Sequence, residues 1–165
     1  MKIFVAVDVE WVRVAYGSHR ILDTPDALKL RIVDALQVMG QEIDVRDVSV
    51  MLYDAPKDAG RKREHDRMVE AGFVMRLGSV LWRERQDGSS MPIQKGVDVL
   101  LTVDAVRAVM KDGYEMVILL TGDADFIPLL QFCREQGVKT VVIGRETVTM
   151  ALVKDADIIC TFGSA

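Results

Sequence analysis

Short, continuous hydrophobic runs alternate along this chain with segments whose apolar residues recur every three to four positions. The first run, residues 3–7, ends at Asp8 and predicts a strand buried on both faces. Asp23-Thr24-Pro25 then supplies a capping residue and an early proline before apolar residues at helical spacing. This pattern predicts a helix at about residues 25–38.

The rest of the chain continues the alternation. Further strands are predicted at residues 48–53, 73–82, 116–120, 138–143 and 157–161. Further helices are predicted at residues 58–71, 96–110, 126–136 and 148–154. Residues 86–90 are all turn-forming or polar, and we expect a mobile surface loop there.

Strands that alternate with helices predict an α/β fold, a three-layer sandwich with a mostly parallel central sheet. The chain has 165 residues, half of them hydrophobic, enough for one sizeable core, so we expect a single domain over residues 1–165. No apolar run approaches the roughly 18 residues of a membrane span, and the N-terminus reads as a core strand rather than a signal peptide. Cys133 and Cys160 lie in apolar surroundings typical of buried thiols in a reducing compartment, so we expect a cytoplasmic protein.

Aspartates follow two of the predicted strands. Asp8 ends the first, while Asp123 and Asp125 follow the strand at residues 116–120 directly. Ligand sites of parallel α/β sheets lie at the carboxyl ends of the strands. Carboxylates gathered there repel and desolvate one another unless a cation compensates, and a set of oxygen ligands favours Mg²⁺ or Mn²⁺ over zinc.

A simpler interpretation is that Asp123 or Asp125 caps the next helix. Capping does not explain the aspartate at another strand end, nor Asp98 at the start of the helix predicted at residues 96–110. Asp104 points roughly 120° away from Asp98 on that helix. We therefore expect Asp98 in the metal site and Asp104 as the buried partner of a basic group.

Charge is distributed unevenly. The net charge is −4, yet residues 57–85 hold eight basic and five acidic residues, which leaves 13 basic and 20 acidic residues elsewhere. A solvated helix face explains part of this stretch; an RNA backbone contact is the functional alternative. The candidates for that contact are Arg61, Lys62, Arg63, Arg67, Arg83 and Arg85.

Three segments resemble motifs of NYN domains of the LabA-like group, which are relatives of PIN nucleases. They are Asp8 after the first strand, KGVDVLLTVD at residues 95–104, and TGDADF at residues 121–126 followed by Pro128. The resemblance runs from about residue 2 to residue 161 and includes Ala156-Asp157 before the last strand.

The resemblance implies a PIN-like, Rossmann-like sheet and a metal-dependent ribonuclease. Its expected substrate is single-stranded RNA. It implies Mg²⁺ or Mn²⁺ held by four catalytic aspartates: Asp8, Asp98, Asp123 and Asp125. Lys95 and Thr121 would then approach the substrate phosphate or orient the metal ligands.

One position departs from the family pattern. Family members usually carry Asn three residues after the first aspartate, and here that residue is Trp11. Indole has one donor and no acceptor, so it cannot replace the amide; Glu10 substitutes in part. Trp11 is either a core residue or a base-stacking one. The substitution favours, as an alternative function, a nucleic-acid or protein-binding module without efficient cleavage.

Two other schemes have less support. Asp8-Val9-Glu10 loosely matches the nucleophile motif of haloacid-dehalogenase-like phosphatases, but Glu10 stands where a second aspartate belongs. A serine or cysteine nucleophile would need a base, but His19 and His65 lie in polar segments, which we expect to be exposed, and neither is a catalytic candidate.

An exposed apolar face on the strand predicted at residues 73–82 would allow a homodimer.

Overall fold

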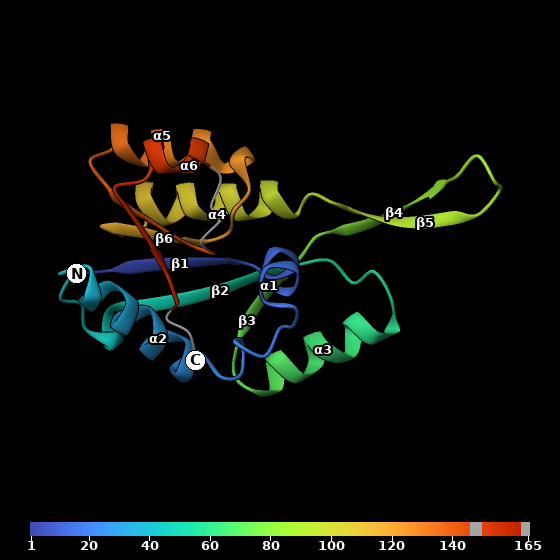
Figure 1. The fold of residues 1–165 in the computed structure, drawn as a ribbon, viewed down its shortest axis with the longest axis horizontal. Coiled ribbons are helices and arrows are strands. Elements are labelled where there is room, and N and C mark those ends of the chain that lie inside the picture. The colour runs from blue at the N-terminus through green and yellow to red at the C-terminus, as the bar shows by residue number, and fades with distance from the viewer. Residues whose placement is uncertain (146–149, 163–165) are drawn as a thin grey trace.

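The computed structural model describes residues 1–145 and 150–162, and its centre is a parallel sheet between two layers of helices (Figure 1). The six strands described in this sheet lie in the order β3-β2-β1-β6-β7-β8, and every neighbouring pair is parallel. Their bounds are β1 Ile3–Asp8, β2 Val48–Asp54, β3 Val74–Leu77, β6 Met116–Leu120, β7 Lys139–Gly144 and β8 Ile158–Thr161. The predicted three-layer α/β sandwich is confirmed.

Helices cover both faces of the sheet (Figure 1). One layer contains α1 Val9–Tyr16, α2 Pro25–Val38 and α3 Ala59–Glu70; the other contains α4 Val97–Met110, α5 Ile127–Glu135 and α6 Met150–Asp155. Two short 3₁₀ helices, η1 Val45–Asp47 and η2 Ala124–Phe126, precede β2 and α5. The helix predicted at residues 148–154 begins outside the described residues.

The two-residue period of β1 divides the core into two clusters. Ile3, Val5 and Val7 pack with the layer of α1, α2 and α3. Phe4 and Ala6 point to the opposite face and pack with α4, α5 and α6. This alternation explains why β1 reads as a continuous apolar run: each of its faces meets a helix layer.

The order of the strands reverses between β1 and β6, because the chain builds β1 to β3 on one side and β6 to β8 on the other. Crevices at such switch points, at the carboxyl ends of the strands, are the usual ligand sites of open α/β sheets. Asp8 is the last residue of β1, and Thr121 follows β6 directly.

The strand predicted at residues 73–82 is wrong in one respect, because it is divided at Gly78. Residues before Gly78 form β3, and those after it form β4 Ser79–Glu84, which pairs antiparallel with β5 Ser90–Lys95. A Cβ at Gly78 would lie 2.6 Å from both the Lys95 carbonyl oxygen and Val97 Cγ2, so only glycine allows the two chain segments to approach this closely.

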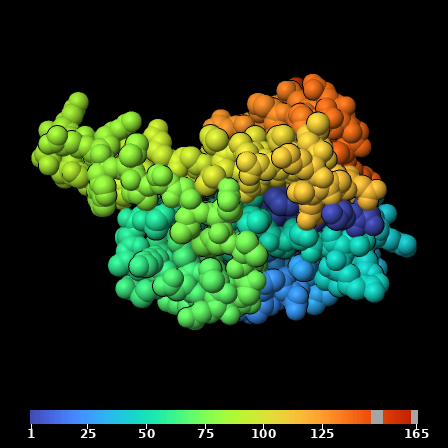
Figure 2. Space-filling view, turned by 180° about the vertical axis from the view of Figure 1, so that it is seen from behind, coloured from blue at the N-terminus to red at the C-terminus, as the bar shows by residue number. Residues whose placement is uncertain are grey.

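The hairpin of β4 and β5, residues 79–95, projects from the body of the molecule, and we call it the hairpin arm (Figures 1 and 2). The loop predicted at residues 86–90 forms its turn, and its mobility stays a prediction. Asp87 Oδ1 accepts hydrogen bonds there from the backbone N and the Oγ of Ser89, at 2.9 and 2.6 Å.

Both cysteines are buried and free, as expected. Burial raises the pKa of Cys133 and of Cys160 to about 11, so both remain neutral thiols. Among the described residues, no helix combines the length and the apolar character needed to cross a bilayer.

Candidate metal centre

Three carboxylates converge at the switch point of the sheet. Asp98, Asp123 and Asp125 each offer one oxygen, and these three oxygens lie within 4.8 Å of one another. Asp98 comes from the first turn of α4, whereas Asp123 and Asp125 come from the turn between β6 and α5. The helix α4 begins at the carboxyl edge of the sheet because it leads back to the start of β6.

Local hydrogen bonds fix the turn that carries two of these aspartates. The backbone N of Asp123 donates to Thr121 Oγ1 at 3.2 Å, and the backbone N of Asp125 donates to Asp123 Oδ1 at 2.9 Å. Asp123 is thus the N-cap of η2, whereas α5, the helix that the simpler interpretation expected an aspartate to cap, begins after Phe126 without a side-chain capping bond. Capping uses one oxygen of Asp123, and a carboxylate has further lone pairs for a second partner.

Asp8 is buried beside this group. Its Oδ1 accepts from the backbone N of Trp11, and its Oδ2 accepts from Thr121 Oγ1, both at 3.2 Å. Burial raises the pKa of Asp8 to about 6, and the negative charges of Asp98 and Asp123 add to the rise, while the two hydrogen bonds oppose it. The four aspartates therefore interact electrostatically.

The donor set fits a hard divalent cation. All of its ligand atoms are carboxylate oxygens, the type that Mg²⁺ and Mn²⁺ prefer. Burial, followed by the charges of Asp123 and Asp125, also raises the pKa of Asp98. A cation between the carboxylates would offset both the cost of burying their charges and their mutual repulsion, the two causes that raise these pKa values.

Trp11 lies against the turn that holds the cluster. A Cβ at Gly122 would be 2.6 Å from Trp11 Nε1, so the indole occupies the space that any side chain at position 122 would need. Trp11 also packs on the core and makes an edge contact with Tyr16, with ring centroids 6.0 Å apart. These contacts favour the core interpretation of Trp11 over base stacking.

Two residues predicted to bind substrate, Glu10 and Arg61, form an ion pair with each other. Glu10 accepts hydrogen bonds from three cations, Arg13, Lys57 and Arg61. Glu10 and Arg61 are therefore part of an ion network between α1 and α3. Of the other predicted substrate-binding residues, Arg63 is exposed on α3, and Lys95 is exposed three residues before Asp98.

The same network extends to a buried pair that the sequence analysis missed. Asp54, at the end of β2, is fully buried, and its Oδ2 contacts Arg13 Nη2 at 2.6 Å and His65 Nε2 at 2.7 Å. Burial raises the pKa of Asp54, but the hydrogen bonds from His65 and Arg13 outweigh it and leave the pKa below its usual value. The expectation that His65 is exposed is wrong: it is 4% exposed, because α3 turns it toward the sheet.

Asp104 lies apart from the cluster, on the side of α4 that faces β2 and β3. It accepts a hydrogen bond from Tyr53 Oη at 3.0 Å and pairs with Arg76 at 3.2 Å. The expectation that Asp104 would be the partner of a basic group is confirmed, although its side chain is 14% exposed and thus only partly buried.

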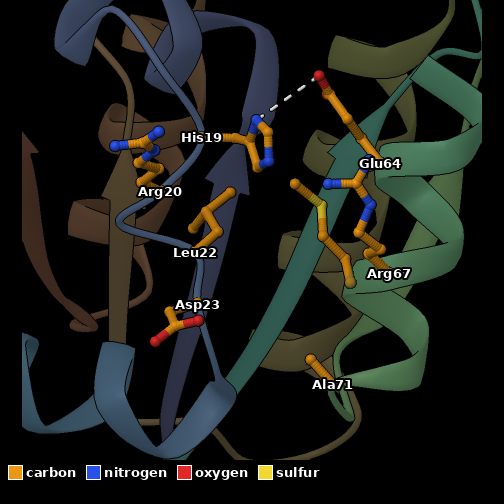
Figure 3. A pocket seen from close by; sticks show the side chains of 8 residues that line it. His19, Arg20, Leu22, Asp23, Glu64, Arg67 and Ala71 are labelled. Carbon is orange, nitrogen blue, oxygen red and sulfur yellow. Dashed lines mark ion pairs between the residues drawn. The ribbon is translucent and has the colours of Figure 1, made fainter. Parts of the chain in front are cut away.

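Two hollows in the surface lie near the acidic cluster and the ion network of α1 and α3. A shallow one of about 310 Å³ lies at the base of the hairpin arm and is lined by Lys95 and Asp98. A larger one, about 590 Å³, lies between α3 and the segment that joins α1 to α2 (Figure 3). Its rim carries the ion pair of His19 Nδ1 and Glu64 Oε1, 3.6 Å apart. Of these two hollows, the one at the arm shares Asp98 with the acidic cluster, whereas the larger one shares no residue with it.

Comparison with known proteins agrees with this arrangement. A curated relative, the uncharacterized protein MJ0482 of Methanocaldococcus jannaschii, is 37% identical over 68 residues, which are 41% of this chain and 28% of that protein. The crystal structure of VPA0982, a protein of unknown function from Vibrio parahaemolyticus, is similar over 97% of this chain and 91% of that chain, with a TM-score of 0.62 and 26% identity. The NYN domain family matches residues 2–161, and this chain therefore belongs to it.

Proposed function

We propose that this protein is a metal-dependent ribonuclease that hydrolyses phosphodiester bonds within single-stranded RNA. The observation that carries the proposal is the convergence of Asp98, Asp123 and Asp125 beside the buried Asp8, at the switch point of an NYN domain. Asp8, Asp98, Asp123 and Asp125 would hold Mg²⁺ or Mn²⁺. When bound, such an ion would act as a Lewis acid on the phosphate and lower the pKa of water.

The protein's own groups would position the reactants. Thr121 is fully buried and joins two parts of the site, because its hydroxyl donates to Asp8 and accepts from the backbone N of Asp123. Thr121 would thereby keep the carboxylates of Asp8 and Asp123 at a fixed separation. The ammonium group of Lys95, on the rim of the hollow that Asp98 lines, would bind a phosphate oxygen of the substrate.

An RNA cleavage assay tests this function. Labelled single-stranded RNA incubated with the protein and Mn²⁺ or Mg²⁺ should be cut internally, and a chelator should stop the reaction. Asp123→Asn should lower the rate by about 100-fold, because it removes a charged ligand. The matched control Asp34→Asn, an exposed residue on α2, should cut at the wild-type rate. RNA that stays intact with every metal would contradict the proposal.

A second candidate function is a binding module that retains the metal site without efficient cleavage. The position of Trp11 favours it, since the indole fills the space beside Gly122 where the family residue would offer an amide. The variant Trp11→Asn distinguishes the ribonuclease from the binding module in the RNA cleavage assay described above. Cleavage by wild type supports the ribonuclease, whereas cleavage only by Trp11→Asn, or by neither, supports the binding module.

The phosphatase alternative loses support from the contacts of Glu10. Its carboxylate oxygens are engaged in ion pairs with Arg13, Lys57 and Arg61. A general acid–base residue must instead place a carboxyl oxygen within hydrogen-bond reach of the leaving group.

A further inference from the structure

The hairpin arm is placed to extend the candidate site. Its second strand ends at Lys95, and α4 begins two residues later and carries Asp98 in its first turn. The space-filling view shows the arm continuing outward from α4 (Figure 2). With six residues in each strand and about 3.4 Å per residue, the arm reaches roughly 20 Å beyond the body.

The register of the arm sorts its charges onto one face. Residues that pair across the strands share a face, so Arg83 lies with Met91, Leu81 with Ile93, and Ser79 with Lys95. The period of two places Arg85 on the same side as Arg83 and places Glu84 on the opposite side. One face of the arm therefore carries three cations and no strand acid. We call it the cationic face.

The opposite face turns toward the body at the root of the arm. Val80 and Gln94 pair with each other on that face; Val80 packs against the core cluster under α4, and Gln94 is partly buried. Ser79 and Lys95, their neighbours on the cationic face, are exposed. The cationic face is therefore accessible from its root to its turn.

The cations of this face are available for a partner. Lys57 and Arg61 pair with Glu10, and Arg76 pairs with Asp104. Over residues 1–145 and 150–162, no ion pair involves a basic residue of the cationic face. Arg61 lies in the same basic stretch of the sequence, but it differs from Arg83 and Arg85 because it is paired with Glu10.

We infer that the cationic face of the hairpin arm binds the phosphates of single-stranded RNA and leads the strand to the acidic cluster, an inference that rests on RNA being the substrate. Arg83 and Arg85 contact phosphates along the arm, and Lys95 contacts the phosphate nearest the cluster. Leu81, 55% exposed, and Ile93 lie between the cations and offer an apolar surface to the sugars and bases. Continuity with the candidate site selects this partner over a second copy of the chain, because the cationic face ends at Lys95, which lines the same hollow as Asp98.

A binding measurement tests the inference. Fluorescence anisotropy of a labelled single-stranded RNA is measured in the Asp123→Asn background, so that no cleavage intervenes. Adding Arg83→Glu and Arg85→Glu should weaken binding by at least 10-fold at low salt. It should also reduce the slope of log affinity against log salt by about 0.7 for each lost phosphate contact. The matched control adds Arg31→Glu and Lys111→Glu, two exposed cations away from the arm, and should lose less than about 3-fold.

The outcomes separate this inference from the proposed function. If wild type cuts RNA but the arm variant binds it as tightly as its parent, the inference fails alone. If wild type never cuts but binding depends on the arm, the inference stands without the ribonuclease. Equal weakening by both double variants, or no RNA binding at all, overturns the inference. So does a wild-type dimer in sedimentation velocity that the arm substitutions convert into monomers, since the cationic face would then belong to a second copy.

Discussion

Replacing Arg13 with methionine is expected to lower the free energy of unfolding by about 3 to 5 kcal/mol. The guanidinium group is 10% exposed and contacts three carboxylates, those of Glu10, Asp54 and Glu64. Methionine fills much of the same space but leaves the fully buried Asp54 with His65 as its remaining side-chain partner. An uncompensated buried charge costs more than the pair contributes, which is why the expected loss is large.

Urea unfolding at several pH values measures this loss. The pKa of Asp54 is held below its usual value in the folded state, so its stabilisation is present above about pH 4 and is lost as the pH falls further. The difference between Arg13→Met and wild type should therefore shrink in acid. Arg31→Met, an exposed arginine on α2, serves as control and should change stability by less than about 0.5 kcal/mol. A loss below 1 kcal/mol for Arg13→Met would contradict the claim that Arg13 compensates the buried charge of Asp54.

The second large effect concerns Asp8, and it has the opposite sign. Its folded-state pKa of about 6 lies above the usual value, so the protonated form stabilises the fold at low pH and that stabilisation is lost as the pH rises through 6. Asp8→Asn keeps the shape of the carboxyl group without its charge. In a chelator at pH 7, the variant should be more stable than wild type by about 2 to 3 kcal/mol, from about two pKa units at 1.4 kcal/mol each.

Thermal or urea unfolding with and without divalent ions checks this expectation. Below about pH 3 the two proteins should be equally stable, because Asp8 is then protonated in both the folded and the unfolded state. Mg²⁺ or Mn²⁺ should stabilise wild type more than Asp8→Asn. Greater stability of wild type in chelator at pH 7 would show that Asp8 does not carry an unfavourable charge.

Much of the fold could be predicted because buried strands appear in the sequence as short apolar runs, and helices as capped segments with apolar residues every three to four positions. The apolar run before Asp8 and the capped helix Pro25–Val38 were identified from periodicity and start signals alone. The helix α1 was missed, although Val9, Val12 and Tyr16 follow helical spacing and Gly17, with φ of 67°, ends it. The strand β5 was missed because it contains Pro92, which argues against a strand in general but is tolerated at the edge of a hairpin.

The aspartates of the candidate site could be predicted from the sequence, but the ion network beside them could not. Carboxylates at strand ends are visible in the sequence, and the rule for parallel sheets brings them together. The pairing of Glu10 with Lys57 and Arg61, and of Asp54 with Arg13 and His65, depends on the packing of α1 against α3. No local pattern records such a contact. The aspartate at the end of β2 was the one available signal for the buried network.

The central claim is that the acidic cluster binds a divalent cation, and isothermal titration calorimetry with Mn²⁺ tests it most directly. Wild type should bind the ion, and Asp123→Asn should weaken binding by 10-fold or more, because one of three converging carboxylates is lost. Asp34→Asn, the exposed control on α2, should bind as wild type does. No binding by wild type, or equal binding by wild type and Asp123→Asn, would contradict the assignment of a metal site to Asp98, Asp123 and Asp125.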